Sequence, residues 1–375
     1  MITVPDTYEA SRARFCAGLA AVQAIWPAAQ LHSHNLTGEA DLSIDWISAE
    51  AQTQKERVLL VTTGAHGIEG FVGSALLQLF MEEYLPQLDL QNTGILLVHA
   101  INPWGMKHRR RVNGHNVDLN RSFVHDFAPL ADSNPDYDLL YRLLNPSSPL
   151  RAVSWQITTF VVQAVTNLAR YGMGRLREAT LKGQFNHPEG IYFGGQSPQE
   201  ETQIMMGLFE QAISGHNQML TIDLHTGYGP RDQMTLVASA QEKMTSAEMT
   251  AKFGIPNVAA ANPEEFYSIQ GDMIEYLYTL MKEKFPGKHF YAATCEFGSF
   301  GDSTLAVIRS LYTSVFENRL FQHGGSASAK SWMEREYTEL FAPTPPDWFE
   351  KAQADARQAF EGLLKAERYI PGVNK

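Results

Sequence analysis

His66 and Glu69 stand three positions apart in the stretch Gly-Ala-His66-Gly-Ile-Glu69-Gly. The stretch separates an apolar, β-branched run at 57–63 from a helix-like run at 71–84, so both side chains are expected on a turn. Such a pair can reach one metal ion, because Zn²⁺ binds imidazole nitrogen and carboxylate oxygen at about 2.0–2.2 Å. The same spacing is also typical of a polar loop that caps a helix. A catalytic site therefore needs a third ligand, a base and a substrate clamp from elsewhere in the chain.

The composition indicates a fully folded globular protein. Of the 375 residues, 44% are hydrophobic and 11% aromatic, which is enough for one large core or two modest ones. The net charge of −11 argues against nucleic acid as a partner, because phosphate binding needs a basic face. One dense basic run, at 107–110, is predicted to be a solvated loop.

Cysteine usage and the N-terminal residues indicate a cytoplasmic protein. Cys16 and Cys295 are too few for a disulfide framework and fit a reducing compartment. The first residues lack a basic segment followed by an apolar one, so we expect no secretory signal. The apolar stretch 15–29 is interrupted by Gln23 and Pro27 and is too short to span a bilayer. No membrane partner is expected, and a homo-oligomer stays open.

Short apolar runs alternate with longer amphipathic runs along the chain. This pattern predicts an α/β fold with a mixed, mainly parallel central sheet flanked by helices. The strands are expected at 42–47, 57–63, 94–101, 219–224, 235–238 and 289–296. The helices are expected at 8–25, 71–84, 200–216, 247–253, 273–284, 304–321 and 348–364.

One segment breaks this rhythm. Residues 126–184 carry a Pro/Ser/Asp-rich loop and then a helical run at 155–181, without a strand signal. Because strands resume afterwards, we predict a helical and loop insertion at 126–190, at the edge of the sheet near the active site, within a single domain of residues 1–375. The Gly/aromatic loop at 185–195 is compatible with a roof over the pocket or with a structural turn.

Four polar motifs fall at or just after the carboxyl ends of predicted strands, where open α/β sheets place their sites. They are His66/Glu69, the stretch 111–123, the stretch 221–229 and the stretch 293–298. His225 can complete a His-Glu-His triad that leaves one position for water, whose pKa a Zn²⁺ ion lowers toward ~7. Alternatively, His225 is a core histidine at a strand end. Asp223 lies on the same strand face and is compatible with orienting an imidazole.

The remaining motifs supply a base and cationic groups. Glu296 closes an apolar strand, so its pKa should be raised, which suits a general base. A helix N-cap or a salt-bridge partner is the alternative. Arginine offers a planar fork for carboxylates, so Asn120-Arg121 is interpreted as a carboxylate clamp. A second arginine near the metal can polarise a carbonyl.

In this order the motifs resemble the M14-type zinc carboxypeptidase superfamily and its aspartoacylase/succinylglutamate desuccinylase relatives, and more narrowly the bacterial DUF2817 branch. The shared pattern is Gly-x-His-x-x-Glu, Arg-x-Asn…Val-Asp-Leu-Asn-Arg-x-Phe, a strand-terminal His and a late Glu, and it covers residues 58–308. A span of about a hundred residues between Arg121 and His225, longer than is typical of carboxypeptidases, is the main departure.

The resemblance implies a role for each matching residue. His66, Glu69 and His225 match the ligands of one Zn²⁺ per chain. Arg111 matches the arginine that polarises the scissile carbonyl, and Glu296 the general base. Three further positions match substrate-binding residues of the family: Asn120, Arg121 and, on the tyrosine loop, Tyr267.

We therefore expect a zinc-dependent hydrolase of an amide bond next to a free carboxylate, acting on a small peptide or an N-acyl amino acid. A carboxypeptidase and an N-acyl-amino-acid deacylase share the metal, base and clamp, so the sequence does not separate them. A non-catalytic metal-binding protein of the same fold is the third alternative. The chain has no Gly-x-Ser-x-Gly elbow and no phosphate-binding loop signature, which disfavours serine hydrolase and phosphate-loop chemistry.

Overall fold

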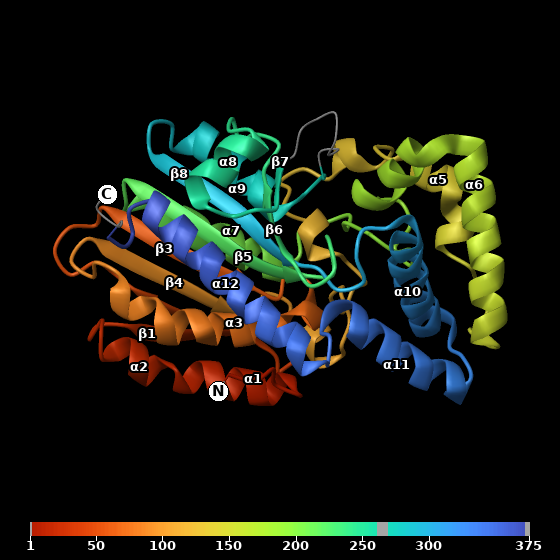
Figure 1. Ribbon diagram of the computed structural model, residues 1–375, viewed down its shortest axis with the longest axis horizontal. Helices are drawn as coiled ribbons and strands as arrows, with labels where there is room; N and C mark the ends of the chain where they lie inside the picture. Colours follow the sequence, from red (N-terminus) through yellow and green to blue (C-terminus); the bar gives the residue numbers. More distant parts are fainter. Residues whose placement is uncertain (1, 261–268, 372–375) are drawn as a thin grey trace.

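A mixed eight-stranded sheet in the order β1-β2-β4-β3-β5-β8-β6-β7 forms the centre of the molecule (Figure 1). The computed structural model describes residues 2–260 and 269–371. The strands are β1 (Gln30–Asn35), β2 (Ser43–Ala49), β3 (Arg57–Thr63), β4 (Thr93–His99), β5 (Gln218–Thr226), β6 (Met234–Ala238), β7 (Val258–Ala260) and β8 (His289–Phe297). The central strands β4, β3, β5 and β8 are parallel, whereas β1–β2, β2–β4 and β6–β8 are antiparallel pairs. The predicted mixed, mainly parallel sheet is confirmed.

The central strands follow from their apolar sequences. β3 is buried along its whole length after Arg57, as expected for a parallel strand covered on both faces. The two edge strands, β1 and β7, are not predicted by the pattern of apolar residues. β1 has the polar sequence Gln-Leu-His-Ser-His-Asn, and β7 has three residues, so neither shows a strong apolar pattern.

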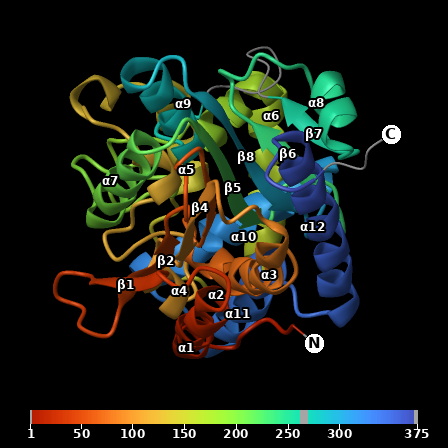
Figure 2. The ribbon, with the colours of Figure 1, turned by 90° about the vertical axis from the view of Figure 1, so that its left-hand side faces the viewer.

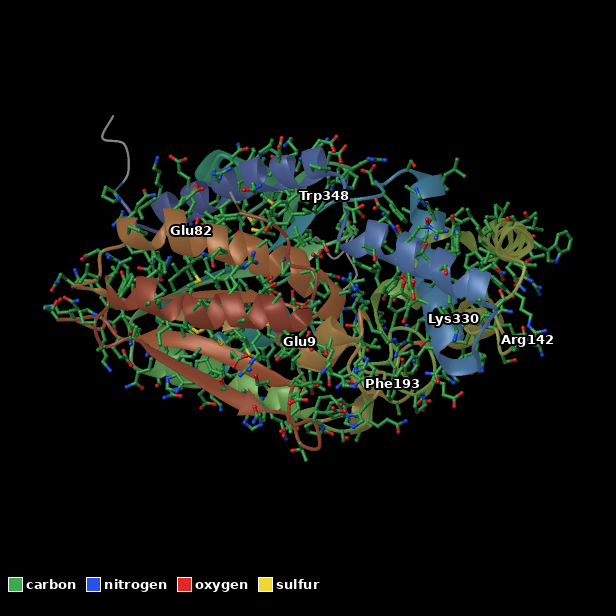
Figure 3. The ribbon with its side chains drawn as sticks, turned by 90° about the horizontal axis from the view of Figure 1, so that it is seen from below. Glu9, Glu82, Arg142, Phe193, Lys330 and Trp348 are labelled. Atoms are coloured by element: carbon green, nitrogen blue, oxygen red, sulfur yellow. The ribbon has the colours of Figure 1, made fainter. Side chains whose placement is uncertain are left out.

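Helices cover both faces of the sheet. In Figure 2, α3 and α12 lie on one face and α7 and α9 on the other. The helices are α1 (Tyr8–Ala17), α2 (Leu19–Gln23), α3 (Gly70–Glu83), α4 (Pro103–Lys107), α5 (Pro135–Leu144), α6 (Val153–Leu181), α7 (Glu200–Ser214), α8 (Ser246–Phe253), α9 (Met273–Lys284), α10 (Thr304–His323), α11 (Ala327–Phe341) and α12 (Pro346–Ala366). Figure 3 shows Trp348 at the start of α12, where its indole donates a hydrogen bond to Gly298 O, just past β8 (2.9 Å).

Two helical expectations need correction. The single helix expected at 8–25 is divided at Gly18 into two helices, α1 and α2. The Pro/Ser/Asp-rich segment expected to be a loop contains α5, because Asn134 caps the helix by accepting from Tyr137 N and Pro135 occupies its first turn. The turn-forming residues thus begin a helix there. α11 was not expected either.

The insertion lies beyond the carboxyl ends of the strands rather than beside an edge strand. Figure 1 shows α5, α6, α10 and α11 together at this end of the molecule. α6 packs against α5 and α10 and is interrupted at Gly172, which has a φ of 84°. These helices therefore cover the end of the sheet where the polar motifs meet. Within the described part of the chain, no helix combines the length and the apolar character that crossing a membrane requires.

Candidate active site

Three neighbouring parallel strands bring the predicted residues together. His66 follows β3, His225 lies near the end of β5, and Glu296 lies near the end of β8. β5 pairs with β3 on one side and β8 on the other, and His225 is directly in register with Glu296. Cross-strand partners share a face of the sheet, so both side chains project on the same side. Residues that are 230 positions apart in the chain thus meet at the carboxyl ends of the central strands.

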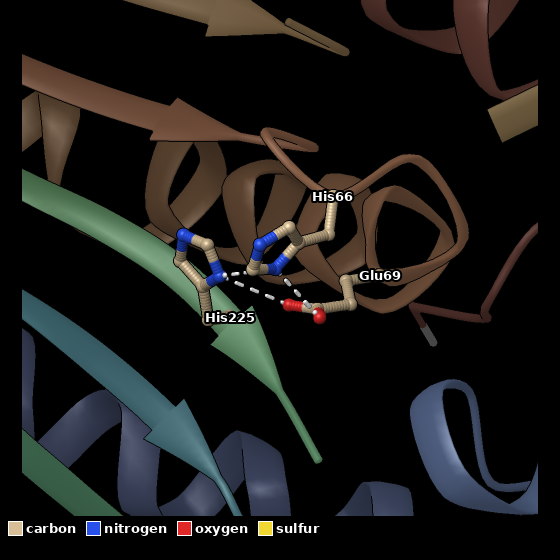
Figure 4. A group of neighbouring side chains, drawn as sticks. All are labelled: His66, Glu69 and His225. Carbon is tan, nitrogen blue, oxygen red and sulfur yellow. Dashed lines mark hydrogen bonds and ion pairs between the residues drawn. The ribbon is translucent and has the colours of Figure 1, made fainter. Parts of the chain in front are cut away.

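The nitrogen and oxygen atoms of His66, Glu69 and His225 converge (Figure 4). His66 Nδ1 lies 2.9 Å from Glu69 Oε1 and 3.2 Å from His225 Nδ1. His225 Nδ1 lies 3.0 Å from Glu69 Oε2. All three side chains are buried, and one ligand atom from each falls within 4.8 Å of the others. The grouping has the composition of a catalytic zinc site with three protein ligands.

The Nε2 atom of each imidazole is hydrogen-bonded to a carboxylate. His66 Nε2 donates to Asp118 Oδ1 at 3.1 Å, and His225 Nε2 donates to Asp223 Oδ2 at 2.6 Å. Thr62 Oγ1 holds Asp223 in turn, at 2.7 Å. Because an ionised carboxylate only accepts, these contacts place the proton of each neutral ring on Nε2. The lone pairs of both Nδ1 atoms are then directed toward Glu69.

The ligand atoms of His66, Glu69 and His225 fit a metal ion. Two imidazole nitrogens and a carboxylate are all acceptors in this arrangement, and only a cation between them relieves their repulsion. A proton on His225 can serve this purpose: burial lowers the pKa of His225, but Asp223 and Glu69 outweigh burial and raise it well above its ordinary value. A divalent cation bound to the same atoms would replace that proton.

Backbone contacts hold the His66–Glu69 turn. Gly67 N donates to Arg111 O at 3.1 Å, and Ile68 N donates to Arg110 O at 2.9 Å. A Cβ on Gly67 would lie 2.1 Å from the carbonyl carbon of Gly105, so only glycine permits this close approach to α4. His66 and Glu69 are therefore fixed to the arginine-bearing segment that follows β4.

Charges around Glu69 keep it ionised. Burial raises its pKa, but His66 and His225 outweigh burial, and the pKa lies well below its ordinary range. Thr226 N also donates to Glu69 Oε2 at 3.0 Å. The pKa of Asp118 is likewise held well below its usual value, because Arg111, His66 and Arg121 together outweigh burial.

Glu296 has the opposite environment. Burial, with a contribution from Glu69, raises its pKa to about 8, although His225 and Arg111 oppose the shift. Its Oε2 atom is buried and makes no hydrogen bond to the described residues. A carboxyl group in this state can hold or release a proton near neutral pH, as a general base requires.

Arg111 is anchored to both acidic members of the site. Its Nε donates to Asp118 Oδ2 at 3.0 Å, and its Nη1 donates to Glu69 Oε1 at 3.4 Å. The side chain is 18% exposed, which leaves part of the guanidinium open to a ligand. Arg111 thus lies next to the group formed by His66, Glu69 and His225.

Asn120 and Arg121 form a buried pair beside Asp118. Asn120 Nδ2 donates to Asp272 Oδ2 at 2.8 Å, and Asn120 Oδ1 accepts from Met273 N at 2.9 Å, so the amide fastens the start of α9. Arg121 Nη1 donates to Asn120 O at 2.8 Å, and its Nε is buried without a hydrogen-bond partner in the described chain. Tyr267, the remaining predicted substrate contact, lies outside the described residues.

The basic run at 107–110 is only partly as predicted. Lys107, His108 and Arg109 are exposed, but Arg110 is buried and donates through Nε to Glu317 Oε1 at 2.6 Å. Its guanidinium also lies 3.6 Å from the ring centroid of Phe321. The expectation of a solvated loop is wrong for Arg110, because α10 supplies an acidic partner that is distant in sequence.

Two site residues were not assigned from the sequence. Asp118 stands in the Val-Asp-Leu-Asn-Arg motif, and the general need of a ligand histidine for a carboxylate partner is the signal that would have indicated it. Tyr192, in the 185–195 loop, is close enough to Arg111 and Arg121 for their charges to lower the pKa of its phenol against the effect of burial. No local pattern marks this tyrosine, since its position depends on the packing of the insertion.

Comparison with known protein families identifies the family of the chain. The model of the family described as "Protein of unknown function (DUF2817)" matches residues 5–355. The chain belongs to the DUF2817 family. No curated protein matches its sequence.

Two solved structures resemble this DUF2817 member in their fold. Bovine thrombin-activatable fibrinolysis inhibitor, in complex with tick carboxypeptidase inhibitor, superposes with a TM-score of 0.51 at 10% identity, covering 95% of this chain and 96% of the other. Carboxypeptidase A from Helicoverpa armigera superposes with a TM-score of 0.52 at 13% identity, covering 96% of this chain and 73% of the other. At such low identity the likeness shows the fold alone, which is that of the carboxypeptidases.

Proposed function

We propose that the protein is a zinc-dependent hydrolase that cleaves an amide bond adjacent to a free carboxylate, in the manner of a carboxypeptidase. The observation that carries the proposal is the meeting of His66, Glu69 and His225 beside Glu296 and Arg111. A structural metal site needs neither a base with a raised pKa nor an arginine anchored next to the ligands. Both features therefore favour catalysis over a purely structural site.

His66, Glu69 and His225 would hold one zinc ion. When bound, zinc supplies a Lewis acid that polarises a carbonyl and lowers the pKa of water. Asp118 and Asp223 fix the orientation of the two imidazoles, so the ligand atoms are positioned before the metal arrives. This preorganisation supports a tight metal site.

Glu296 and Arg111 are the side chains that act on the water and the substrate in this proposal. Glu296 takes a proton from the attacking water and delivers it to the leaving nitrogen, which converts a poor leaving group into an amine. Arg111 donates from its guanidinium to the carbonyl oxygen as negative charge develops there. Its contacts with Asp118 and Glu69 hold the guanidinium in place, so little reorganisation is needed during the reaction.

Arg121 and Asn120 bind the substrate carboxylate in this proposal. Arg121 is buried, 4% exposed, and is not paired with a carboxylate among the described residues. Asp118 and Asp272 act on this charge electrostatically. A buried guanidinium without a direct ion pair is nevertheless costly, so an incoming carboxylate compensates it. Asn120 Nδ2 uses one hydrogen for Asp272 and retains a second for the substrate. Tyr267 remains a proposed substrate contact.

A substrate panel tests the function and separates its alternatives. Purified protein with zinc is incubated with peptides that have free or amidated C-termini and with N-acyl amino acids. Release of a C-terminal residue from the free peptides alone supports a carboxypeptidase, whereas preferential cleavage of N-acyl amino acids supports a deacylase. No hydrolysis by protein that retains about one zinc per chain would indicate a non-catalytic metal-binding protein.

The ligand assignment has its own test. Metal analysis of the wild-type protein should give about one zinc per chain, and the His66→Ala variant should lose it. Stoichiometric zinc in His66→Ala contradicts the assignment. A matched control is His115→Ala, which removes an exposed histidine that contacts Gln199 outside the group formed by His66, Glu69 and His225.

A further inference from the structure

The start of α9 is bound to the segment that carries Asn120 and Arg121. Phe123 N donates to Gly271 O at 3.0 Å, and Met273 N donates to Asn120 Oδ1 at 2.9 Å. A Cβ on Gly271, whose φ is 70°, would lie 2.1 Å from Arg121 O, so only glycine allows the two backbones to approach this closely. The two segments, which are far apart in the sequence, therefore hold each other in place beside the site.

Asp272 takes part in this contact with both oxygens of its carboxylate. Its Oδ1 accepts from Ile274 N at 2.9 Å and from Glu275 N at 3.0 Å, and these two bonds cap α9. Its Oδ2 accepts from Asn120 Nδ2 at 2.8 Å. One carboxylate thus connects the first turn of the helix to the side chain of Asn120.

The contacts of Asn120 permit only one orientation of its amide. A backbone N–H only donates and an ionised carboxylate only accepts, so Oδ1 must face Met273 N and Nδ2 must face Asp272. The reversed amide would place two donors together at Met273 and two acceptors together at Asp272. Because the amide group is planar, fixing one Nδ2 hydrogen on Asp272 also fixes the direction of the other.

That other Nδ2 hydrogen is available to a ligand. Among the described residues, Asn120 Nδ2 donates to Asp272 alone. The guanidinium of Arg121 lies against the same residue, because its Nη1 donates to Asn120 O at 2.8 Å, and its buried Nε has no hydrogen-bond partner in the described chain. An anion that binds Arg121 can therefore also accept from the amide, and hydrogen bonds to an ionised acceptor are the strong ones.

We propose that Asp272 is a positioning residue for substrate recognition. It holds the Asn120 amide in the orientation that presents the second Nδ2 hydrogen to the substrate carboxylate beside Arg121. The inference rests on the proposed function in taking Asn120 and Arg121 as the residues that bind the substrate carboxylate. It adds a residue that does not touch the substrate, and it makes the start of α9 a determinant of substrate affinity.

Equilibrium binding in the presence of zinc tests Asp272 without using hydrolysis. The probe is 3-phenylpropanoate, and 3-phenylpropan-1-ol, which lacks the charge, is the comparison ligand. In Asp272→Asn the new oxygen can still cap α9, but the new amide nitrogen then faces Asn120 Nδ2, so two donors meet and the Asn120 amide is displaced. Binding of 3-phenylpropanoate should weaken about 10-fold, with little effect on the alcohol.

Asp89→Asn is the matched control. Asp89 likewise accepts from an asparagine amide, Asn92 Nδ2 at 2.7 Å, just before β4 and therefore at the opposite end of the sheet from the site. The substitution breaks an equivalent pair and should leave both affinities unchanged. Zinc content equal to that of the wild type establishes that the variants are folded.

A double-mutant cycle separates positioning from a purely structural role. If Asp272 acts through Asn120, adding Asp272→Asn to Asn120→Ala should change the affinity for 3-phenylpropanoate by less than about twofold. Additive losses from the two substitutions would show that Asp272 acts independently of Asn120 and would overturn the inference.

The remaining outcomes separate this inference from the proposed function. Unchanged 3-phenylpropanoate affinity in Asp272→Asn, with binding lost in Arg121→Ala, overturns the role of Asp272 and leaves the proposed hydrolase intact. Failure of the wild type to bind 3-phenylpropanoate, or equal affinity for the carboxylate and the alcohol, also overturns it. Binding that depends on Asp272 through Asn120, in a protein that hydrolyses no member of the substrate panel, supports the inference and contradicts the hydrolase.

Discussion

Glu69 and Glu296 are two glutamates at one end of the same sheet, and their surroundings are opposite. Glu69 lies beside two imidazoles, accepts from Thr226 N and contacts Arg111, and its pKa is well below the ordinary range. Glu296 has a buried oxygen without a described hydrogen-bond partner, and its pKa is raised to about 8. The opposite environments therefore suit the two identical side chains to the different tasks proposed for them.

In the proposed function, this difference corresponds to separate roles for Glu69 as a metal ligand and Glu296 as a base. A metal ligand must stay ionised, and the cationic surroundings of Glu69 ensure that it does. A base must exchange protons near neutral pH, and desolvation of Glu296 provides this. The following variants weaken one member of the comparison at a time.

Glu69→Gln should have the largest effect. The substitution keeps the size of the side chain but removes the negative charge that would bind the cation beside the two imidazoles. The metal should therefore be lost. We expect hydrolysis of the best panel substrate to fall by about 10³-fold or more. The measurement is kcat/KM in the presence of added zinc. Near-normal activity would show that Glu69 is not a ligand.

Glu296→Gln should have the next largest effect and a different character. The amide cannot accept or deliver a proton, so kcat should fall by about 10²- to 10⁴-fold. Zinc content should be unchanged, since Glu296 is not among the ligands. Undiminished kcat in this variant contradicts its role as base and supports a different proton acceptor.

Asp118→Asn should act through His66 and Arg111. The substitution keeps the shape but weakens the acceptor that faces His66 Nε2, so zinc affinity should fall by about 10- to 100-fold. Competition with a chelator of known affinity measures this change. Asp223→Asn, which weakens the corresponding support of His225, is the matched variant. If neither substitution alters zinc affinity, the two carboxylates do not orient the ligands.

The pH dependence of activity should show the smallest effect. Glu296 is active as a base only when deprotonated, so kcat/KM should rise with pH and then level off. The rising limb should lie above the range of an ordinary carboxyl, because burial raises the pKa of Glu296, and below about 8 once a bound cation is nearby. We expect about a tenfold change per pH unit on this limb. A flat profile between about pH 5 and about pH 9 would contradict the role of Glu296.

The sequence was most informative where geometry is regular. Strand ends in a parallel sheet meet at one edge, so His66, His225 and Glu296 were predicted together from three separated strands. The central strands were found for the same reason, since a run such as β3 is apolar throughout. Local chemistry and strand position were sufficient for these residues.

Features that depend on packing between distant segments could not be predicted in the same way. Arg110 was expected in solvent, yet it pairs with Glu317 more than two hundred positions away. The loop that carries Tyr192 is held by hydrogen bonds from α5, α10 and the 113–121 segment. Neither contact leaves a periodic or spacing signal in the sequence.

Zinc content across three proteins tests the division between Glu69 and Glu296 most directly. Wild-type protein, Glu69→Gln and Glu296→Gln are purified identically, dialysed against zinc and analysed for bound metal per chain. We expect about one zinc per chain in the wild type and in Glu296→Gln, and little zinc in Glu69→Gln. Full zinc in Glu69→Gln, or its loss from Glu296→Gln, would show that the two glutamates do not have these separate roles.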